Sequence, residues 1–220
     1  MLRLILLLSL WLPILVVPVE EDWEFPDDDL ETHLDQVSEG ELTLLEAPPD
    51  EPVHYHHNRI RITPDSLQDG WVILDQCHYN LDPVAESQIV YHSERIRNLR
   101  LLNAEHITEV RIEGPTVQLK GIGTKAQLCL QVESLAFLKL ADDRYRLRTG
   151  PYMRRFLDGY YPMRVSLEVY FPADRLELQE LWPLPGKAGK LERGKGFLLW
   201  DGWFTGRLIT AFDFVTDRQP

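Results

Sequence analysis

From residue 58 onward the chain is built of short apolar runs in which hydrophobic and polar residues alternate. In the run 108–114, Val110 and Ile112 fall on one side of an extended chain, while charged residues fall on the other. The runs are rich in β-branched and aromatic residues and are bounded by Gly, Pro, Asp or Asn. They cover residues 70–77, 87–92, 97–102, 108–114, 116–122, 126–133, 144–150, 164–171, 196–200 and 206–214. This pattern predicts an all-β domain, a sandwich or partly closed barrel of about ten short strands.

The Gly, Pro, Asp and Asn residues between these runs predict the turns. Residues 151–161 are expected to form the one short helical turn, because Pro151 suits a first helical position and Gly159 a stop. Asp201-Gly202, flanked by Trp200 and Trp203, favours a type I′ turn and with it a C-terminal hairpin over 196–214.

One further glycine-rich stretch, "GIGTK" at 121–125, lacks the full spacing of a phosphate-binding loop. It is expected to be a hairpin turn.

The N-terminal part of the chain is different in kind. Residues 1–19 hold Arg3 followed by an apolar run interrupted by Pro13, which is typical of an export signal, either cleaved or retained as a membrane anchor. This segment predicts a periplasmic or secreted protein whose first residues contact the membrane. Residues 20–57 are expected to be an acidic, mostly disordered tether, and 58–220 a single β domain.

The net charge of −12 is concentrated in that tether. Residues 20–51 contain fourteen acidic residues and no Lys or Arg, whereas 52–220 hold 22 basic and 21 acidic residues. The β domain is therefore nearly neutral, and neither a nucleic-acid partner nor a globally acidic surface is implied.

The two cysteines, Cys77 and Cys129, are expected to form a disulfide, because an exported protein meets an oxidising compartment. Two separately buried thiols are the alternative.

Three histidines lie within four positions of "VHYHHNRIR", and a similar spelling recurs at "VYHSERIR" (90–97). His54, His56 and His57 could bind Zn²⁺ or Cu²⁺, with His78, His92 or His106 as a further ligand. On a strand, however, His54 and His56 share one face and His57 the other. No metal-binding spacing supports the set, so exposed histidines at the start of the domain are the simpler interpretation.

The most distinctive basic stretch is "RYRLRTGPYMRRFLDGYYPM" (144–163). Its arginines alternate along a predicted strand and are interleaved with aromatic residues, a pattern suited to binding anions or stacking on sugars. A solvated strand face with local ion pairs is the alternative. The candidate ligand-binding residues are Arg144, Arg146, Arg148, Tyr152, Arg154, Arg155 and Tyr160.

The sequence contains no recognisable catalytic constellation and implies no cofactor. We therefore expect an exported, non-enzymatic β domain that binds a partner protein or an anionic envelope polymer through the Arg/Tyr stretch. A metal-binding protein using His54, His56 and His57 is the first alternative. A hydrolase with dispersed catalytic residues is the second.

Overall fold

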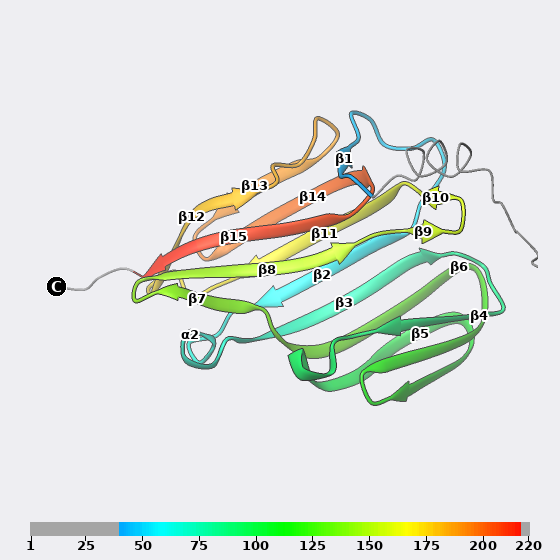
Figure 1. The fold of residues 1–220 in the computed structure, drawn as a ribbon, viewed down its shortest axis with the longest axis horizontal. Helices are drawn as coiled ribbons and strands as arrows, with labels where there is room; N and C mark the ends of the chain where they lie inside the picture. The colour runs from blue at the N-terminus through cyan, green and yellow to red at the C-terminus, as the bar shows by residue number, and fades with distance from the viewer. Residues whose placement is uncertain (1–39, 217–220) are drawn as a thin grey trace, which may run out of the picture. The chain divides into compact units, whose positions relative to one another are not determined.

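The computed structural model describes residues 40–216, and these residues form an all-β fold with one short helical turn (Figure 1). The predicted export signal and residues 20–39 of the predicted tether lie outside the described residues. The elements are β1 (Thr43–Leu44), β2 (Tyr55–Arg61), α2 (Ser66–Asp69), β3 (Trp71–Leu81), β4 (Glu86–Val90), η1 (Ser93–Arg95), β5 (Ile96–Glu113), β6 (Thr116–Leu135), β7 (Phe137–Ala141), β8 (Arg144–Tyr152), β9 (Arg155–Phe156), β10 (Gly159–Tyr160), β11 (Met163–Tyr170), β12 (Leu176–Trp182), β13 (Lys190–Gly194), β14 (Phe197–Thr205) and β15 (Leu208–Thr216).

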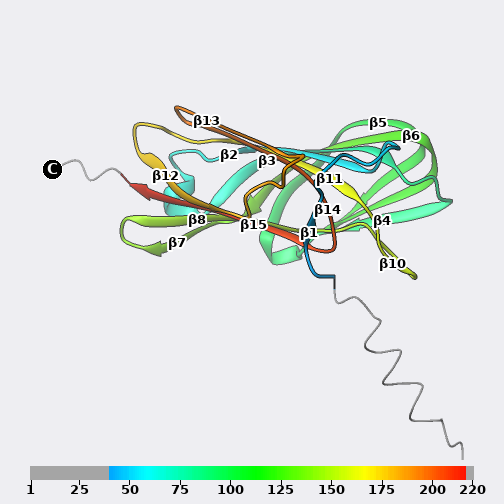
Figure 2. The same cartoon turned by 90° about the horizontal axis from the view of Figure 1, so that it is seen from above.

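Two sheets make up most of the fold. The larger has nine strands in the order β1-β14-β11-β2-β3-β6-β4, with β13 beside β14 and β5 beside β6. The smaller has four strands in the order β12-β15-β8-β7. Figure 2 shows the smaller sheet as a layer facing one side of the larger. A separate two-stranded hairpin, β9–β10, stands clear of both sheets in the same view.

The space between the layers is filled by the apolar residues that alternate along the strands. Val165, Leu167 and Val169 of β11 are fully buried, and so are Leu147 of β8 and Phe212 of β15. Because the period of a strand is two, the residues between them face the opposite side of each sheet. We call the side of the larger sheet that faces the smaller one its inner face, and the other its outer face.

A second core lies where β5 and β6 form a long hairpin. Its buried residues, such as Val117, Leu128 and Leu130, all belong to β6. β6 pairs with β3 through residues 126–135 and with β4 through residues 116–120. Besides β5, one strand therefore pairs with two others, and residues 121–125 separate the segment of β6 that pairs with β4 from the segment that pairs with β3.

This arrangement corrects the prediction that residues 121–125 form a hairpin turn. They lie inside the continuous strand β6, and Gly121 adopts a positive φ of 60° beside the side chain of Thr108. A Cβ at Gly121 would overlap Thr108, so glycine permits the bend without breaking the strand.

The predicted C-terminal hairpin over 196–214 is also wrong. β14 belongs to the larger sheet and β15 to the smaller, so the two strands do not pair with each other. Asp201 and Gly202 lie within β14, where a Cβ on Gly202 would come within 2.9 Å of the Trp200 indole. Glycine there makes room for the largest fully buried side chain of the described core rather than forming a turn.

The predicted helical turn at 151–161 is likewise absent. The first part of this stretch ends β8, and the rest forms β9 and β10, whose register pairs Arg155 with Tyr160. The α-helical turn of the fold is α2, over Ser66–Asp69.

The β domain begins before the predicted boundary at residue 58. β2 starts at Tyr55, and β1 pairs with β14 through Thr43 and Leu44. Leu42 and Leu44 pack against the core between the sheets. Residues 40–57 are thus part of the fold rather than of a tether.

Cys77 and Cys129 form a disulfide, as predicted. They are directly opposite each other on β3 and β6, on the outer face of the larger sheet. The bridge is consistent with an oxidising compartment. Within residues 40–216, no helix has the length and hydropathy needed to cross a bilayer.

Candidate binding cavity

A cavity of about 860 Å³ opens beside the inner face of β2 and β3. Its other walls come from β4, η1, β6, the end of β8 and β9. Most of the lining is apolar, and its apolar residues include Ile60, Val72, Leu74, Leu81, Ile89, Leu119, Ile122, Phe156 and Met163. A concave, mainly apolar space of this size is typical of small-molecule sites.

The floor of the cavity holds three stacked imidazole rings, from His54, His56 and His78. His56 and His78 are opposite each other on β2 and β3, and their ring centroids lie 4.1 Å apart. The His54 ring lies 5.3 Å from that of His78 and 6.2 Å from that of His56. All three interplanar angles are 25° or less.

This stacking bears on the metal hypothesis. Two of the three rings already face each other through ring nitrogens, because His54 and His78 form a hydrogen bond. Among residues 40–216, no group of three or more His, Cys, Asp or Glu is placed to hold a metal ion. His57 faces away from the other two histidines, as alternation predicts.

A chain of hydrogen bonds holds the floor in place. The Tyr91 hydroxyl donates to Gln76 Oε1, and Gln76 Nε2 donates to His56 Nε2. His56 Nε2 is therefore an acceptor, which leaves the ring proton on Nδ1. His54 Nε2 and His78 Nδ1 lie 3.1 Å apart and form a hydrogen bond whose donor is set by the tautomers of the two rings.

Two polar groups near the floor are incompletely bonded. His78 Nε2 is buried and has no hydrogen-bond partner within the described residues. The same holds for both polar atoms of the Asn58 side chain, two residues beyond His56 on the same face of β2. Buried polar atoms are usually paired, so this concentration marks the region as a candidate functional site.

Burial keeps the floor uncharged. Desolvation lowers the pKa of His54 to about 4, although the carboxylate of Asp82 acts in the opposite direction. It lowers the pKa of His78 to about 3 and that of His56 well below the usual value. Desolvation also raises the pKa of the Tyr152 phenol to about 12. At neutral pH these side chains are neutral hydrogen-bonding groups.

The charged residues of the lining are mostly basic. Asp82 is the single acid among the described lining residues, which include Arg95, Arg148, Arg154 and Arg155. Arg154 Nε lies 2.9 Å from Asp82 Oδ2, and its Nη2 bonds the other carboxylate oxygen, so these two charges offset each other. The Arg95 guanidinium donates to the Leu135 carbonyl.

The other two arginines of the lining, Arg148 and Arg155, have no ion-pair partner among the described residues. Within residues 40–216, neither Arg148 nor Arg155 forms an ion pair, and both side chains are exposed. Arg155 lies over the Tyr160 ring at 5.5 Å. The cavity therefore combines an apolar interior, a neutral polar floor and two unpaired guanidinium groups beside exposed lining residues.

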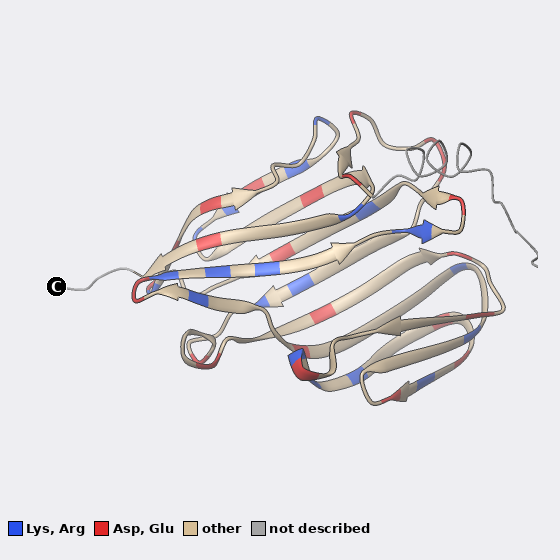
Figure 3. Cartoon of the chain, viewed as in Figure 1, with Lys and Arg blue, Asp and Glu red and all other residues tan. Residues whose placement is uncertain are grey.

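The structure brings together part of each predicted cluster. Arg148, Tyr152, Arg154 and Arg155 line the same cavity as His54 and His56. The alternation along β8 is as predicted, and basic residues recur along this strand in Figure 3. Only the second half of β8, from Arg148 to Tyr152, lines the cavity, and the first half does not.

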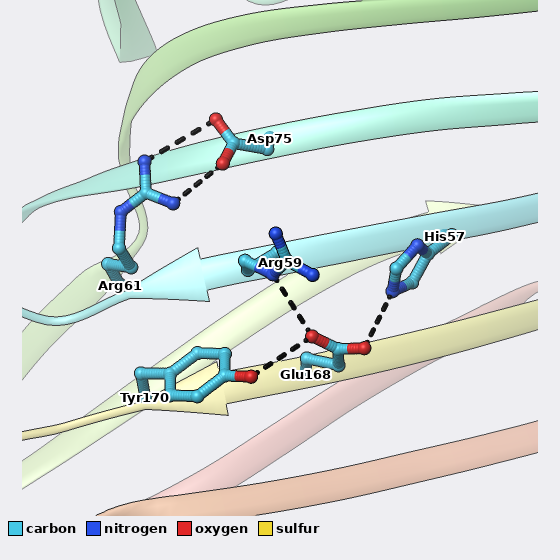
Figure 4. A network of polar contacts seen from close by, with 6 residues as sticks. All are labelled: His57, Arg59, Arg61, Asp75, Glu168 and Tyr170. Carbon is cyan, nitrogen blue, oxygen red and sulfur yellow. Dashed lines mark hydrogen bonds and ion pairs between the residues drawn. The ribbon is translucent and has the colours of Figure 1, made fainter.

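Four predicted residues lie elsewhere. Arg144 and Tyr160 do not line the cavity, and Arg146 makes a two-point ion pair with Asp213 at 2.6 and 2.7 Å. His57 donates to Glu168 on the outer face (Figure 4).

Sequence reasoning missed Gln76, Tyr91 and Asp82. Gln76 could have been found, because it precedes His78 by two residues and must share its face on a strand. Tyr91 belongs to the second copy of the Tyr-His spelling, but Tyr55 in the first copy faces the outer side, so the two copies are not structurally equivalent.

Comparison with known proteins finds no family model and no curated relative that matches the chain. The functional argument therefore starts from the cavity itself.

Proposed function

We propose that the protein is an exported, non-enzymatic binding protein that takes up an anionic amphiphile. The apolar part of the ligand occupies the cavity, and its carboxylate or phosphate meets Arg148 and Arg155. The observation that carries this proposal is the composition of the lining: an apolar space of about 860 Å³ with four arginines and one acid. The disulfide and the N-terminal export pattern support a periplasmic or secreted location.

The two parts of such a ligand would be bound by different forces. Burial of apolar surface contributes about 25 cal/mol per Å², and most of the affinity is expected from this source. Guanidinium groups form paired, charge-assisted hydrogen bonds with carboxylate and phosphate, so the arginines supply orientation and a preference for anions. The neutral floor adds hydrogen-bonding groups without an opposing charge.

A concave site favours a small ligand over the envelope polymer or protein partner that the basic stretch alone suggested. The unpaired positive charge is not continuous along β8, because Arg146, between Arg144 and Arg148, is neutralised by Asp213. A polymer would need such a continuous surface, whereas an amphiphile needs only the two unpaired arginines next to the apolar space.

Binding also suits the histidines better than acid–base catalysis does. A general base works best with a pKa near the operating pH, and the pKa values of His54 and His78 are lowered to about 4 and 3. Both cysteines are committed to the disulfide, so neither offers a thiolate.

Calorimetric titration with dodecanoate and with its uncharged analogue dodecanol tests the proposal. We expect saturable binding of dodecanoate, weakened about tenfold in an Arg148→Ala/Arg155→Ala variant, which corresponds to about 1.4 kcal/mol. Dodecanol should bind wild type and variant alike, because it lacks the anion.

Arg144→Ala provides the matched control. Arg144 lies on the same strand and the same face as Arg148, is exposed like it, and does not line the cavity. The proposal fails if wild-type protein shows no saturable binding of dodecanoate, or if Arg144→Ala weakens binding as much as Arg148→Ala.

A further inference from the structure

The β9–β10 hairpin displays an unusual group of exposed apolar side chains. Its register pairs Phe156 with Gly159, so Leu157 and Asp158 form the turn at the tip. Leu157 is fully exposed, and Phe156 is 41% exposed. Figure 2 shows this hairpin standing away from the two sheets. Phe156 contacts the Tyr161 ring edge-on at 5.4 Å, whereas the Leu157 side chain is left entirely to solvent.

Further exposed apolar residues lie beside the hairpin at the cavity. Met153, just before β9, and Val90, at the end of β4, are both exposed and both line the cavity, as Phe156 does. An apolar edge of this kind, next to an opening and on a projecting turn, is typical of an interaction site rather than of an ordinary surface.

Unpaired positive charge exceeds unpaired negative charge in this region, because Arg148 and Arg155 both line the cavity without an ion pair among residues 40–216, whereas the tip holds one acid, Asp158. Arg155 is unpaired within the described residues and precedes Phe156, while Arg154 lies 5.6 Å from the Phe156 ring centroid and is paired with Asp82. The one acid of the tip, Asp158, accepts a hydrogen bond from Tyr161 at 2.5 Å. Aromatic and leucine side chains together with arginine are the combination that peripheral proteins place at the boundary between headgroups and acyl chains.

We propose that the tip of the β9–β10 hairpin docks on an anionic lipid bilayer, with Leu157 and Phe156 entering the boundary region and Arg155 meeting lipid phosphates. This inference rests on the proposed function, because it identifies the membrane as the source of the amphiphile. A ligand leaving the bilayer at this point would reach the cavity across Phe156 and Met153 without crossing water. The hairpin would then have two uses, as part of the cavity wall and as the membrane contact.

The test uses the full-length chain with an environment-sensitive nitrobenzoxadiazole dye on Leu157→Cys, kept under non-reducing conditions so that the native disulfide stays intact. The matched control carries the dye on Leu184→Cys. Leu184 is also an exposed leucine, at 61%, but it lies between β12 and β13 and does not line the cavity. Both proteins have the same N-terminal segment, so any membrane contact made by that segment is common to them.

With phosphatidylglycerol vesicles we expect the dye at position 157 to brighten and to be quenched by nitroxides on the lipid acyl chains. The dye at position 184 should respond to neither, and vesicles of phosphatidylcholine alone should give a weaker response at position 157. Equal responses at the two positions, or no response at position 157, would overturn the docking proposal.

A second variant separates docking from ligand binding. Leu157 does not line the cavity, so Leu157→Asp should leave the affinity for dodecanoate in solution unchanged while slowing its uptake from phosphatidylglycerol vesicles about tenfold. Unchanged uptake would contradict docking. If dodecanoate does not bind in solution, the proposed function fails, and the dye response at position 157 then decides separately whether the hairpin docks.

Discussion

The polar residues on the two faces of the strand pair β2–β3 differ in how completely they are hydrogen-bonded. On the outer face His57 and Arg59 each donate to Glu168 at 3.1 Å, and Arg61 lies 2.6 Å from Asp75 (Figure 4). On the inner face His78 and Asn58, which belong to the same two strands, keep buried polar atoms without partners in the described residues. The outer network is complete within the protein, whereas the inner one is not.

The energetic consequence differs accordingly. The outer ion pairs are partly exposed, with the Glu168 side chain 22% and the Asp75 side chain 20% exposed. Surface pairs contribute about 0–1 kcal/mol each and these lie at the upper end of that range, so the outer network adds only modestly to stability. A buried polar atom without a partner costs about 1–3 kcal/mol. A fold that keeps such groups beside a cavity is more readily explained by a ligand than by stability. Three stability predictions test this contrast.

The largest effect is expected for the disulfide on the outer face. Cys77 and Cys129 are separated by 52 positions, and closing a loop of that length stabilises a fold by about 4 kcal/mol on the chain-entropy model. Cys77→Ala/Cys129→Ala should therefore lower the free energy of unfolding in urea by ~2–5 kcal/mol. Wild-type protein with its disulfide reduced is the control and should match the variant. A change below about 1 kcal/mol would mean that the strand ladder alone fixes this region.

The inner face should make stability depend on pH. The pKa of His78 is lowered to about 3 in the folded protein, so between about 3 and 6.5 the unfolded state binds more protons than the folded state. The free energy of unfolding should then fall as the pH is lowered from 6.5, by about 3 kcal/mol at pH 4. Above pH 6.5 the contribution of His78 to the free energy of unfolding should not change with pH.

Urea unfolding at a series of pH values checks this. His78→Leu should reduce the slope between pH 6.5 and 4.5, a window above the ordinary pKa of carboxylates. A wild-type protein whose stability does not change over this window would show that the imidazoles of the floor are solvated, and the contrast between the faces would be lost.

The smallest effect is expected for the outer network. Burial acts to raise the pKa of Glu168, but the bonds from Arg59 and His57 outweigh it and hold the pKa below its ordinary value. Glu168→Gln keeps the shape and removes the charge, so it should cost only about 1 kcal/mol at pH 7. The measurement is again unfolding in urea. A loss above about 3 kcal/mol would instead show that the outer network is as important as a buried one.

The alternation of residues allowed the fold class to be predicted, but not the lengths of the strands. The sequence divides β5 at residues 103–107 and β6 at the glycine-containing residues 121–125, because it does not distinguish a bend within a strand from a turn between two. The turn predicted at Gly202 was wrong for a related reason. Its small size serves the buried ring of Trp200, a contact that depends on packing and not on local preference.

The site was predictable only in part. The face shared by His54 and His56 followed from a period of two, and the Arg/Tyr stretch from its composition. The histidines and the Arg/Tyr stretch meet at one cavity because the larger sheet places β2, and the smaller sheet the end of β8, beside the same space. These two strands are far apart in sequence, so the sequence does not predict this meeting. The acidic composition before residue 52 likewise gave no sign that Leu42 and Leu44 pack against the core, because that packing depends on the pairing of β1 with β14, far along the chain.

The central claim is that the inner face of the larger sheet binds a ligand and the outer face does not. The most direct test compares two tryptophan substitutions on β6, Ser134→Trp and Gln127→Trp. Ser134 lines the cavity, whereas Gln127 lies on the outer face, and both side chains are half-buried. Calorimetric titration of each variant with dodecanoate measures the outcome, with circular dichroism to establish that both are folded. The account predicts that Ser134→Trp fills the cavity and abolishes binding while Gln127→Trp binds as the wild type does. Equal binding by the two folded variants would contradict it.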